Sequence, residues 1–198
     1  AAARAEAVRA RLGLPADVPV ITQIGNFKPQ KGPLDFVRVA GVVRDRHPDA
    51  HFLMLGDGPL LGAAKQLAED LDLGGRLIFC GWHDDVPGLL AATSVSVLTS
   101  YHEGLPCSVV ESLAAGVPVV ATAVDGTVEV VRSGDNGFLA PAGDVEGLAS
   151  AVCRILDEPD LRAALAARAP QRLEEFDNDL MVRRQEELYR CLGGRSRS

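Results

Sequence analysis

The stretch Thr99–Gly126, which reads TSYHEGLPCSVVESLAAGVPVVATAVDG, decides the fold of this 198-residue chain. A loop that carries Glu103 leads into an apolar helix that contains Glu111. Pro106 is expected at the first helical position, where its missing N–H needs no partner. Residues 117–121 follow as a predicted buried strand. Free N–H groups at the helix start favour anions, and carboxylates accept hydrogen bonds from sugar hydroxyls, so this stretch predicts a pocket for a phosphorylated sugar compound.

Outward from this stretch, predicted strands and helices alternate. Apolar runs bounded by Gly or Pro predict strands at 18–25, 51–56, 76–80, 95–99 and 137–140. Helical periodicity predicts helices at 33–46, 60–71, 85–92, 145–156, 160–168 and 180–192. Alternation of this kind implies a parallel sheet with right-handed crossovers. We therefore expect an α/β fold: a single Rossmann-like, doubly wound parallel sheet of about six strands, with helices on both faces and extra C-terminal helices.

The length and the two ends of the chain define its predicted organisation. A chain of 198 residues can bury a full core, so we expect one domain, at 18–192. Residues 1–17 are predicted to be an interdomain connection, and 193–198 a disordered tail. The chain starts with Ala1 and not with Met, which leaves room for a segment upstream.

Composition argues against a nucleic-acid partner, a membrane-spanning helix and a disulfide framework. The net charge of −7 argues against nucleic acid as the main partner. No apolar run approaches the roughly 20 residues of a membrane-spanning helix. The four cysteines are far apart and form no C-x-x-C pair, which favours free thiols in a reducing cytoplasm.

The loops that follow the predicted strands should lie together. In a parallel sheet these loops share the carboxyl edge, and ligands bind at that edge where the strand order reverses. In the usual doubly wound order the first and fourth strands are neighbours at the reversal. These strands lead to Lys31 and Glu103, so we expect both side chains in one crevice.

Three motifs in order carry a resemblance to a known family. Glu103-Gly-Leu-Pro-(four residues)-Glu111-Ser-Leu-Ala-Ala-Gly116 resembles the E-x7-E signature of retaining glycosyltransferases of the GT-B fold, family 4 or group 1 type. Upstream, Gly25-Asn-Phe-Lys-Pro-Gln-Lys31-Gly32 and Gly56-Asp-Gly-Pro59 fall where this family has its lysine-glycine and GDGP motifs. The similarity runs from about Val18 to about Tyr189.

The resemblance implies a function for the chain. It would be the C-terminal, donor-binding half of an enzyme that moves a hexosyl unit from a UDP-, GDP- or ADP-linked sugar to an acceptor hydroxyl, with retention and without a metal or other cofactor. The N-terminal, acceptor-binding domain would be missing, so the isolated domain would be inactive. Peripheral membrane contact through that missing domain stays open.

The resemblance also implies roles for individual residues. Lys31 and Glu103 would be catalytic: Lys31 offsets the charge of the leaving diphosphate, and Glu103 lies near the transferred sugar. Glu111 would accept the ribose hydroxyls. The full predicted donor-binding set is Gly25, Asn26, Lys31, Gly56, Gly81, Trp82, Glu103, Gly104, Leu105 and Glu111. The alternatives are a solvated surface lysine for Lys31, a solvated loop acid for Glu103 and a solvent-facing side chain for Glu111.

Other positions have two readings. Asn26 stands where the family usually has an arginine, and asparagine brings no charge to a diphosphate, although Lys28 could substitute. The turn at 56–59 could bind a ligand or only connect a strand to a helix. Trp82 could stack on a base or pack in the core. The run 83–85 (His-Asp-Asp) suggests a metal, but Asp84 or Asp85 fits a helix N-cap, and we expect no metal.

The last two positions flank the predicted crevice. His102 could touch the site or be solvated, and Asp125 could narrow the crevice at a position where relatives often carry glycine.

Three rival functions stay open. The chain could be a non-catalytic nucleotide-sugar-binding subunit that needs a separate acceptor-binding chain. It could be a related GT-B-like enzyme, an epimerase or a phosphorylase, although no pyridoxal-phosphate lysine context is found. It could also be an inactive scaffold domain, which Asn26 favours.

Overall fold

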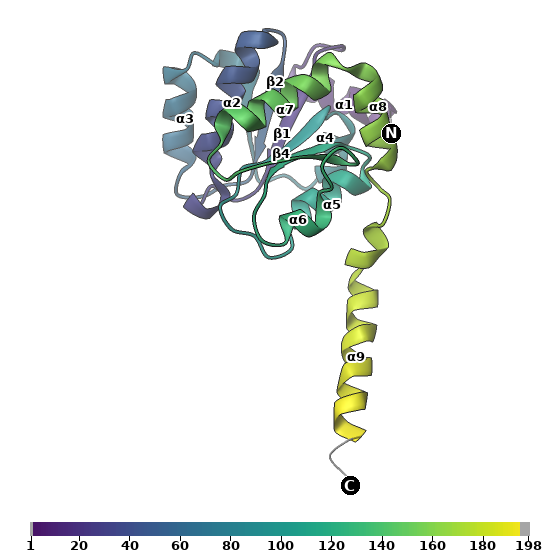
Figure 1. The fold of residues 1–198 in the computed structure, drawn as a ribbon. Helices are drawn as coiled ribbons and strands as arrows, with labels where there is room; N and C mark the ends of the chain where they lie inside the picture. The colour runs from purple at the N-terminus through teal and green to yellow at the C-terminus, as the bar shows by residue number, and fades with distance from the viewer. Residues whose placement is uncertain (1, 195–198) are drawn as a thin grey trace.

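A parallel six-stranded sheet forms the centre of the computed structural model, which describes residues 2–194 (Figure 1). The strands are β1 (Val20–Ile24), β2 (His51–Leu55), β3 (Leu77–Gly81), β4 (Val95–Leu98), β5 (Val119–Thr122) and β6 (Gly137–Ala140). Their order is β3-β2-β1-β4-β5-β6, and every neighbouring pair is parallel. The predicted doubly wound sheet is therefore confirmed, and its order reverses between β1 and β4.

Helices connect and cover the strands (Figure 1). They are α1 (Ala2–Leu12), α2 (Pro33–Arg46), α3 (Leu61–Asp70), α4 (Val86–Ala91), α5 (Cys107–Ala114), α6 (Thr127–Val130), α7 (Val145–Asp157), α8 (Pro159–Arg168) and α9 (Asn178–Gly194), with short 3-10 turns at Pro29–Lys31, Gly74–Arg76 and Leu173–Phe176. The prediction that Pro106 is the first helical residue is wrong. Its ψ of 86° is not helical, so Pro106 precedes α5 as the N-cap.

Alternate residues of the strands build two layers of core. Phe52 and Met54 of β2 face α2, α3 and α7, where the rings of Phe36 and Phe52 meet edge to face at 6.5 Å. Leu53 and Leu55 of the same strand join a separate cluster with residues of α1 and α4. This period of two, with both faces buried, explains why the strands read as continuous apolar runs.

The two ends of the described chain differ in how they pack. Val8 of α1 and Leu14 are buried in the cluster that α4 also joins, so α1 packs on the body of the domain. The boundary predicted at residue 17 stays a prediction. At the other end α9 extends away from the sheet (Figure 1). Residues 193 and 194 of the predicted tail belong to this helix, and 195–198 lie outside the described residues. No helix within 2–194 combines the length and the apolarity needed to span a bilayer.

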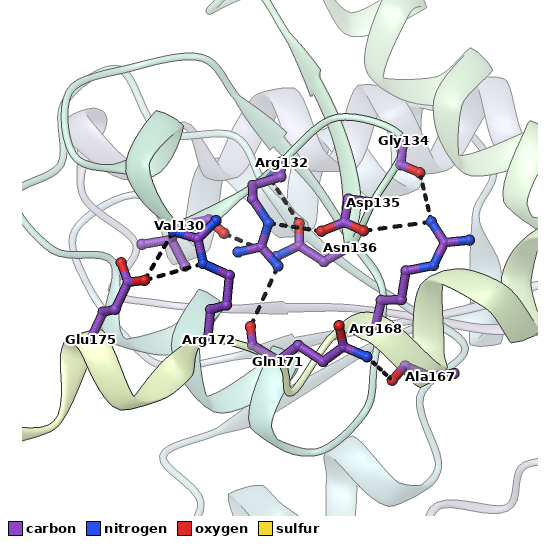
Figure 2. Close-up of polar contacts among 10 residues, drawn as sticks. All are labelled: Val130, Arg132, Gly134, Asp135, Asn136, Ala167, Arg168, Gln171, Arg172 and Glu175. Atoms are coloured by element: carbon purple, nitrogen blue, oxygen red, sulfur yellow. Dashed lines mark hydrogen bonds and ion pairs between the residues drawn. The ribbon is translucent and has the colours of Figure 1, made fainter.

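A polar network ties the segment before β6 to the end of α8 (Figure 2). Asp135 accepts from Arg132 Nε at 2.8 Å and pairs with Arg168 at 3.5 Å. Asn136 is fully buried and bridges the chain from Arg132 N–H to Val130 O. The Arg132 guanidinium lowers the pKa of the Asp135 carboxyl, since it stabilises the ionised form. This network precedes β6 and therefore lies toward the amino edge of the sheet, where it holds α8 in place.

Candidate functional site

A cleft of about 340 Å³ opens at the carboxyl edge of the sheet. Its walls are the loops after β1, β2 and β3 on one side and the start of α5 on the other. The lining residues are Ile24, Gly25, Asn26, Lys31, Leu55, Gly56, Trp82, His83, Val86, Leu105, Cys107, Ser108 and Glu111. This set brings together most of the predicted donor-binding residues. Gly81, Glu103 and Gly104 do not line the cleft but lie beside residues that do.

Lys31 and Glu103 meet, as the order of the strands implies. Lys31 Nζ donates to Glu103 Oε1 at 2.6 Å, and the two side chains are 25% and 5% exposed. Gly32, which follows Lys31, has φ 56°, and a Cβ there would collide with the carbonyl oxygen of Thr99, so only glycine lets the two loops approach. The interpretations of Lys31 and Glu103 as solvated surface groups are therefore wrong.

Three further groups hold Glu103. Ser100 is fully buried, and its Oγ donates to Glu103 Oε1 at 2.6 Å. The Glu103 N–H donates to Asp125 Oδ2 at 3.0 Å, and Gly126 N–H donates to Glu103 O at 3.4 Å. Ser100 was not predicted as a hydrogen-bond partner of Glu103, although it lies only three residues before Glu103 in the sequence. Asp125 supports the loop as well as flanking it.

Glu111 projects from the polar side of α5. Val109 and Leu113 are buried, and Ser112 Oγ donates to Ser96 Oγ at 2.8 Å, which fixes the opposite side of this helix on the sheet. Glu111 itself is exposed, but the surface on which it lies is a wall of the cleft. The cleft therefore has a carboxylate on the α5 wall and the Lys31 cation on the other.

Glycines form the floor of the cleft. Gly25 and Gly56 both line it, and Gly56 has φ 123°. A Cβ on Gly56 would collide with the carbonyl oxygen of Gly25, so the two loops touch through their main chains. The turn at 56–59 thus connects β2 to α3 and also shapes the cleft.

Trp82 and the segment after it form the end of the cleft near β3. Trp82 is 79% exposed and lines the cleft, so the interpretation of this residue as a core-packing side chain is wrong. Asp85 accepts from Gly88 N–H at 3.0 Å and caps α4, as predicted. Arg4 also donates to Asp85 and lowers the pKa of that carboxyl. Within residues 2–194 no three potential metal ligands cluster, and the absence of a metal stays a prediction.

The structure also places Asn26, Lys28 and His102, each of which had two interpretations. Asn26 lines the cleft, whereas Lys28 is exposed and lies outside the lining. The His102 ring is 79% exposed, with Nδ1 3.7 Å from Asp125 Oδ2, so it is a solvated neighbour of the Glu103 loop. The predicted donor-binding set did not include six residues that line the cleft: Ile24, Leu55, His83, Val86, Cys107 and Ser108.

The fold and the cleft define a Rossmann-like α/β domain with a polar ligand cleft where the strand order reverses. The chain belongs to the family of glycosyl transferases group 1, whose sequence model matches residues 5–172.

Curated relatives and a solved structure agree with this assignment. Lipopolysaccharide core biosynthesis glycosyltransferase LpsE of Rhizobium meliloti is 39% identical over 83% of this chain and 47% of its own length. The UDP-Gal:alpha-D-GlcNAc-diphosphoundecaprenol alpha-1,3-galactosyltransferase of Escherichia coli is 33% identical over 74% of this chain and 39% of its own. Anabaena HepE, solved in complex with UDP-glucose, superposes with a TM-score of 0.83 at 26% identity over 93% of this chain and 51% of its own. The chain thus spans about half the length of the curated relatives that it matches.

Proposed function

We propose that this chain is the donor-binding half of a glycosyltransferase that moves a hexosyl unit from a nucleotide-diphosphate sugar to an acceptor hydroxyl, with retention. One observation carries the proposal. Lys31, which is hydrogen-bonded to Glu103, lies on one side of the cleft, and Glu111 lies on the other side. Such a cleft suits a ligand with a diphosphate at one end and hydroxyl groups beside it. That HepE was solved with UDP-glucose supports a nucleotide sugar as the ligand.

Each wall of the cleft has a task in this proposal. Lys31 would stabilise the charge that develops on the diphosphate as the glycosidic bond breaks. The start of α5, with the amides of Gly104 and Leu105 ahead of it, would bind phosphate or sugar oxygens. Glu111 would accept hydrogen bonds from the ribose, and Glu103 would lie near the transferred sugar. In this proposal Lys31 and the backbone amides, and not a metal, stabilise the diphosphate.

The acceptor would bind to a second domain. The chain matches 47% and 39% of the length of the two curated relatives, which supports an N-terminal acceptor-binding part as its partner. In this proposal the isolated chain binds the donor and transfers no sugar.

Asn26 favours a second candidate, a nucleotide-sugar-binding domain without catalysis. This residue lines the cleft beside Gly25 and brings no charge to a diphosphate. Lys31 is then the only lysine or arginine among the described residues that line the cleft. Restoring charge by Asn26→Arg should tighten nucleotide binding if the cleft holds a diphosphate.

Calorimetric titration of the chain with UDP, GDP and ADP tests the proposal. We expect selective binding of at least one nucleotide, which Glu111→Ala weakens about tenfold or more, as loss of a charged hydrogen bond predicts. Glu69→Ala is the matched control, since Glu69 is an exposed helical glutamate on α3 outside the cleft. Binding that both variants leave unchanged would place the nucleotide elsewhere, and absence of binding to all three would favour the inactive scaffold.

A further inference from the structure

The two loops that carry Lys31 and Glu103 are joined by more than that ion pair. Tyr101, two residues before Glu103, donates its backbone N–H to the carbonyl oxygen of Gln30 at 2.8 Å. The Gln30 side chain adds a second bond, since its Nε2 donates to the carbonyl oxygen of His102 at 2.8 Å. The residues next to Lys31 and Glu103 along the chain are thus bonded to each other.

A third contact runs from the side chain of Tyr101 to α2. The Tyr101 hydroxyl donates to Asp35 Oδ2 at 2.6 Å, and Arg38 Nη1, from the same helix as Asp35, donates to Oδ1 at 2.7 Å. Asp35 is 8% exposed, so both of its oxygens are bonded where water has little access. Hydrogen bonds to an ionised carboxylate are among the stronger ones in proteins. The phenol of Tyr101 is therefore a fixed point in its loop.

This fixed point lies within the turn that places the Glu103 carboxylate. Glu103 follows Tyr101 by two residues, which is at most about 7 Å of extended chain. Ser100 directly precedes Tyr101, and its buried Oγ donates to Glu103 Oε1 at 2.6 Å. A shift of the Tyr101 backbone would move Ser100 and Glu103 together, and so would move the carboxylate away from Lys31.

We propose that Tyr101 is a positioning residue, which through Asp35 and Gln30 holds Glu103 against Lys31. Tyr101 is not among the described residues that line the cleft, so it acts through the ion pair and not on the ligand. Its effect on donor binding rests on the proposed function of the cleft, in which Lys31 meets a diphosphate. Its hold on the ion pair does not depend on a ligand.

Competitive acetylation of the whole chain by acetic anhydride, followed by mass spectrometry, tests this hold without a ligand. The lysines of the chain are Lys28, Lys31 and Lys65, and the exposed Lys28 and Lys65 serve as internal references. Lys31 should react more slowly than both, because its side chain is 25% exposed and bonded to Glu103. Tyr101→Phe removes one hydroxyl and should raise the relative rate at Lys31 about threefold or more, as loss of a hydrogen bond to a charged group predicts.

Variants of Asp35 separate positioning from general stability. Asp35→Leu should raise the rate at Lys31 as Tyr101→Phe does, and the double variant should equal either single one, since each breaks the same bond. Asp35→Asn keeps an oxygen for the Tyr101 hydroxyl and should keep the slow rate. The controls are Arg38→Met, which removes the other partner of Asp35, and Ile155→Val, which shortens a buried side chain in α7. Both controls should leave the rate unchanged.

Calorimetric titration with UDP, GDP and ADP connects the positioning to donor binding. Tyr101→Phe should weaken the binding of whichever nucleotide the unaltered chain binds by about threefold or more, and Asp35→Asn should not. An acetylation rate at Lys31 that stays unchanged in Tyr101→Phe, or that rises as much in Ile155→Val, would overturn the inference.

The two measurements also separate this inference from the proposed function. Faster acetylation of Lys31 in Tyr101→Phe with an unchanged nucleotide affinity would overturn the role of Tyr101 in donor binding. If acetylation responds as expected and no nucleotide binds even to the unaltered chain, the proposed function fails and the positioning of the ion pair stands.

Discussion

The Lys31–Glu103 pair gives the sharpest prediction about stability. Glu103 is almost fully buried, and Lys31 and Ser100 both donate to its Oε1. Lys31→Met removes the charge but keeps most of the aliphatic stem. The variant then leaves a buried carboxylate with one hydroxyl donor instead of a cation, which is costly in a medium that solvates charge poorly.

The expected magnitude follows from the exposure of the two side chains. Removing one partner of a fully buried ion pair costs about 3–5 kcal/mol. Lys31 is 25% exposed, so water and the remaining Ser100 hydrogen bond offset part of that loss. We expect Lys31→Met to lower the free energy of unfolding by about 2 kcal/mol. Lys31→Met with Glu103→Gln should cost less than the sum of the two single changes, because the uncompensated charge is gone.

Urea denaturation followed by far-ultraviolet circular dichroism measures these free energies. Lys28→Met is the control, since Lys28 is an exposed lysine of the same loop and its loss should cost under about 0.5 kcal/mol. If the two changes add within about 0.5 kcal/mol, the pair is not coupled and the reasoning fails. A Lys31→Met variant as stable as the control would contradict it equally.

Three further predictions concern single residues. Gly126 has an ordinary φ of −64°, but a Cβ there would collide with the carbonyl oxygen of Gly104. Gly126→Ala should therefore lower the free energy of unfolding by about 1–3 kcal/mol in the same urea assay. An unchanged denaturation midpoint would contradict this prediction. A bound nucleotide should slow the alkylation of Cys107, which lines the cleft, but not the alkylation of the exposed Cys191 on α9. Mass spectrometry can follow both reactions, and equal slowing at the two cysteines would refute the prediction. The hydrogen bond from Tyr101 to Asp35, more than burial, raises the phenol pKa above its usual 10.0, so its contribution to stability is full below pH 10 and is lost as pH rises through the folded value. Phenolate absorbance, compared with Tyr101→Phe, should show this delayed titration, and an ordinary pKa would count against the bond.

Much of the fold could be predicted because it depends on local pattern. Alternating buried runs and helical segments specify a parallel sheet, and crossover handedness then leaves few strand orders. The meeting of Lys31 and Glu103 followed from that order, and the structure confirms it. The cap at Asp85 was likewise readable, since an acidic residue before a short helix has a local role.

Other features could not be predicted, because neither the strand order nor a local pattern indicates them. The contact of Arg11 with His83 joins positions 72 apart in the chain, and nothing in the periodicity of either segment indicates it. The sequence left Trp82 with two interpretations, base stacking or core packing, because a large aromatic side chain often packs, and its exposure excludes the second. The four-residue helix α6 is too short to show a repeat. The start of α5 shifted by one residue because the loop ahead of it, and not proline chemistry, sets ψ at Pro106.

The glycine floor of the cleft has a consequence for how this family could change its ligand. At Gly56 no side chain can be introduced without moving the loop after β1, because a Cβ there would collide with the carbonyl oxygen of Gly25. Mutation therefore cannot reshape the surface at Gly56 in small steps. Variation is easier at the rim, at residues such as Trp82, His83 and Leu105, whose side chains stand at least partly in solvent. The part of the ligand that rests on the floor should stay constant among descendants of this sequence, while the part that meets the rim diverges.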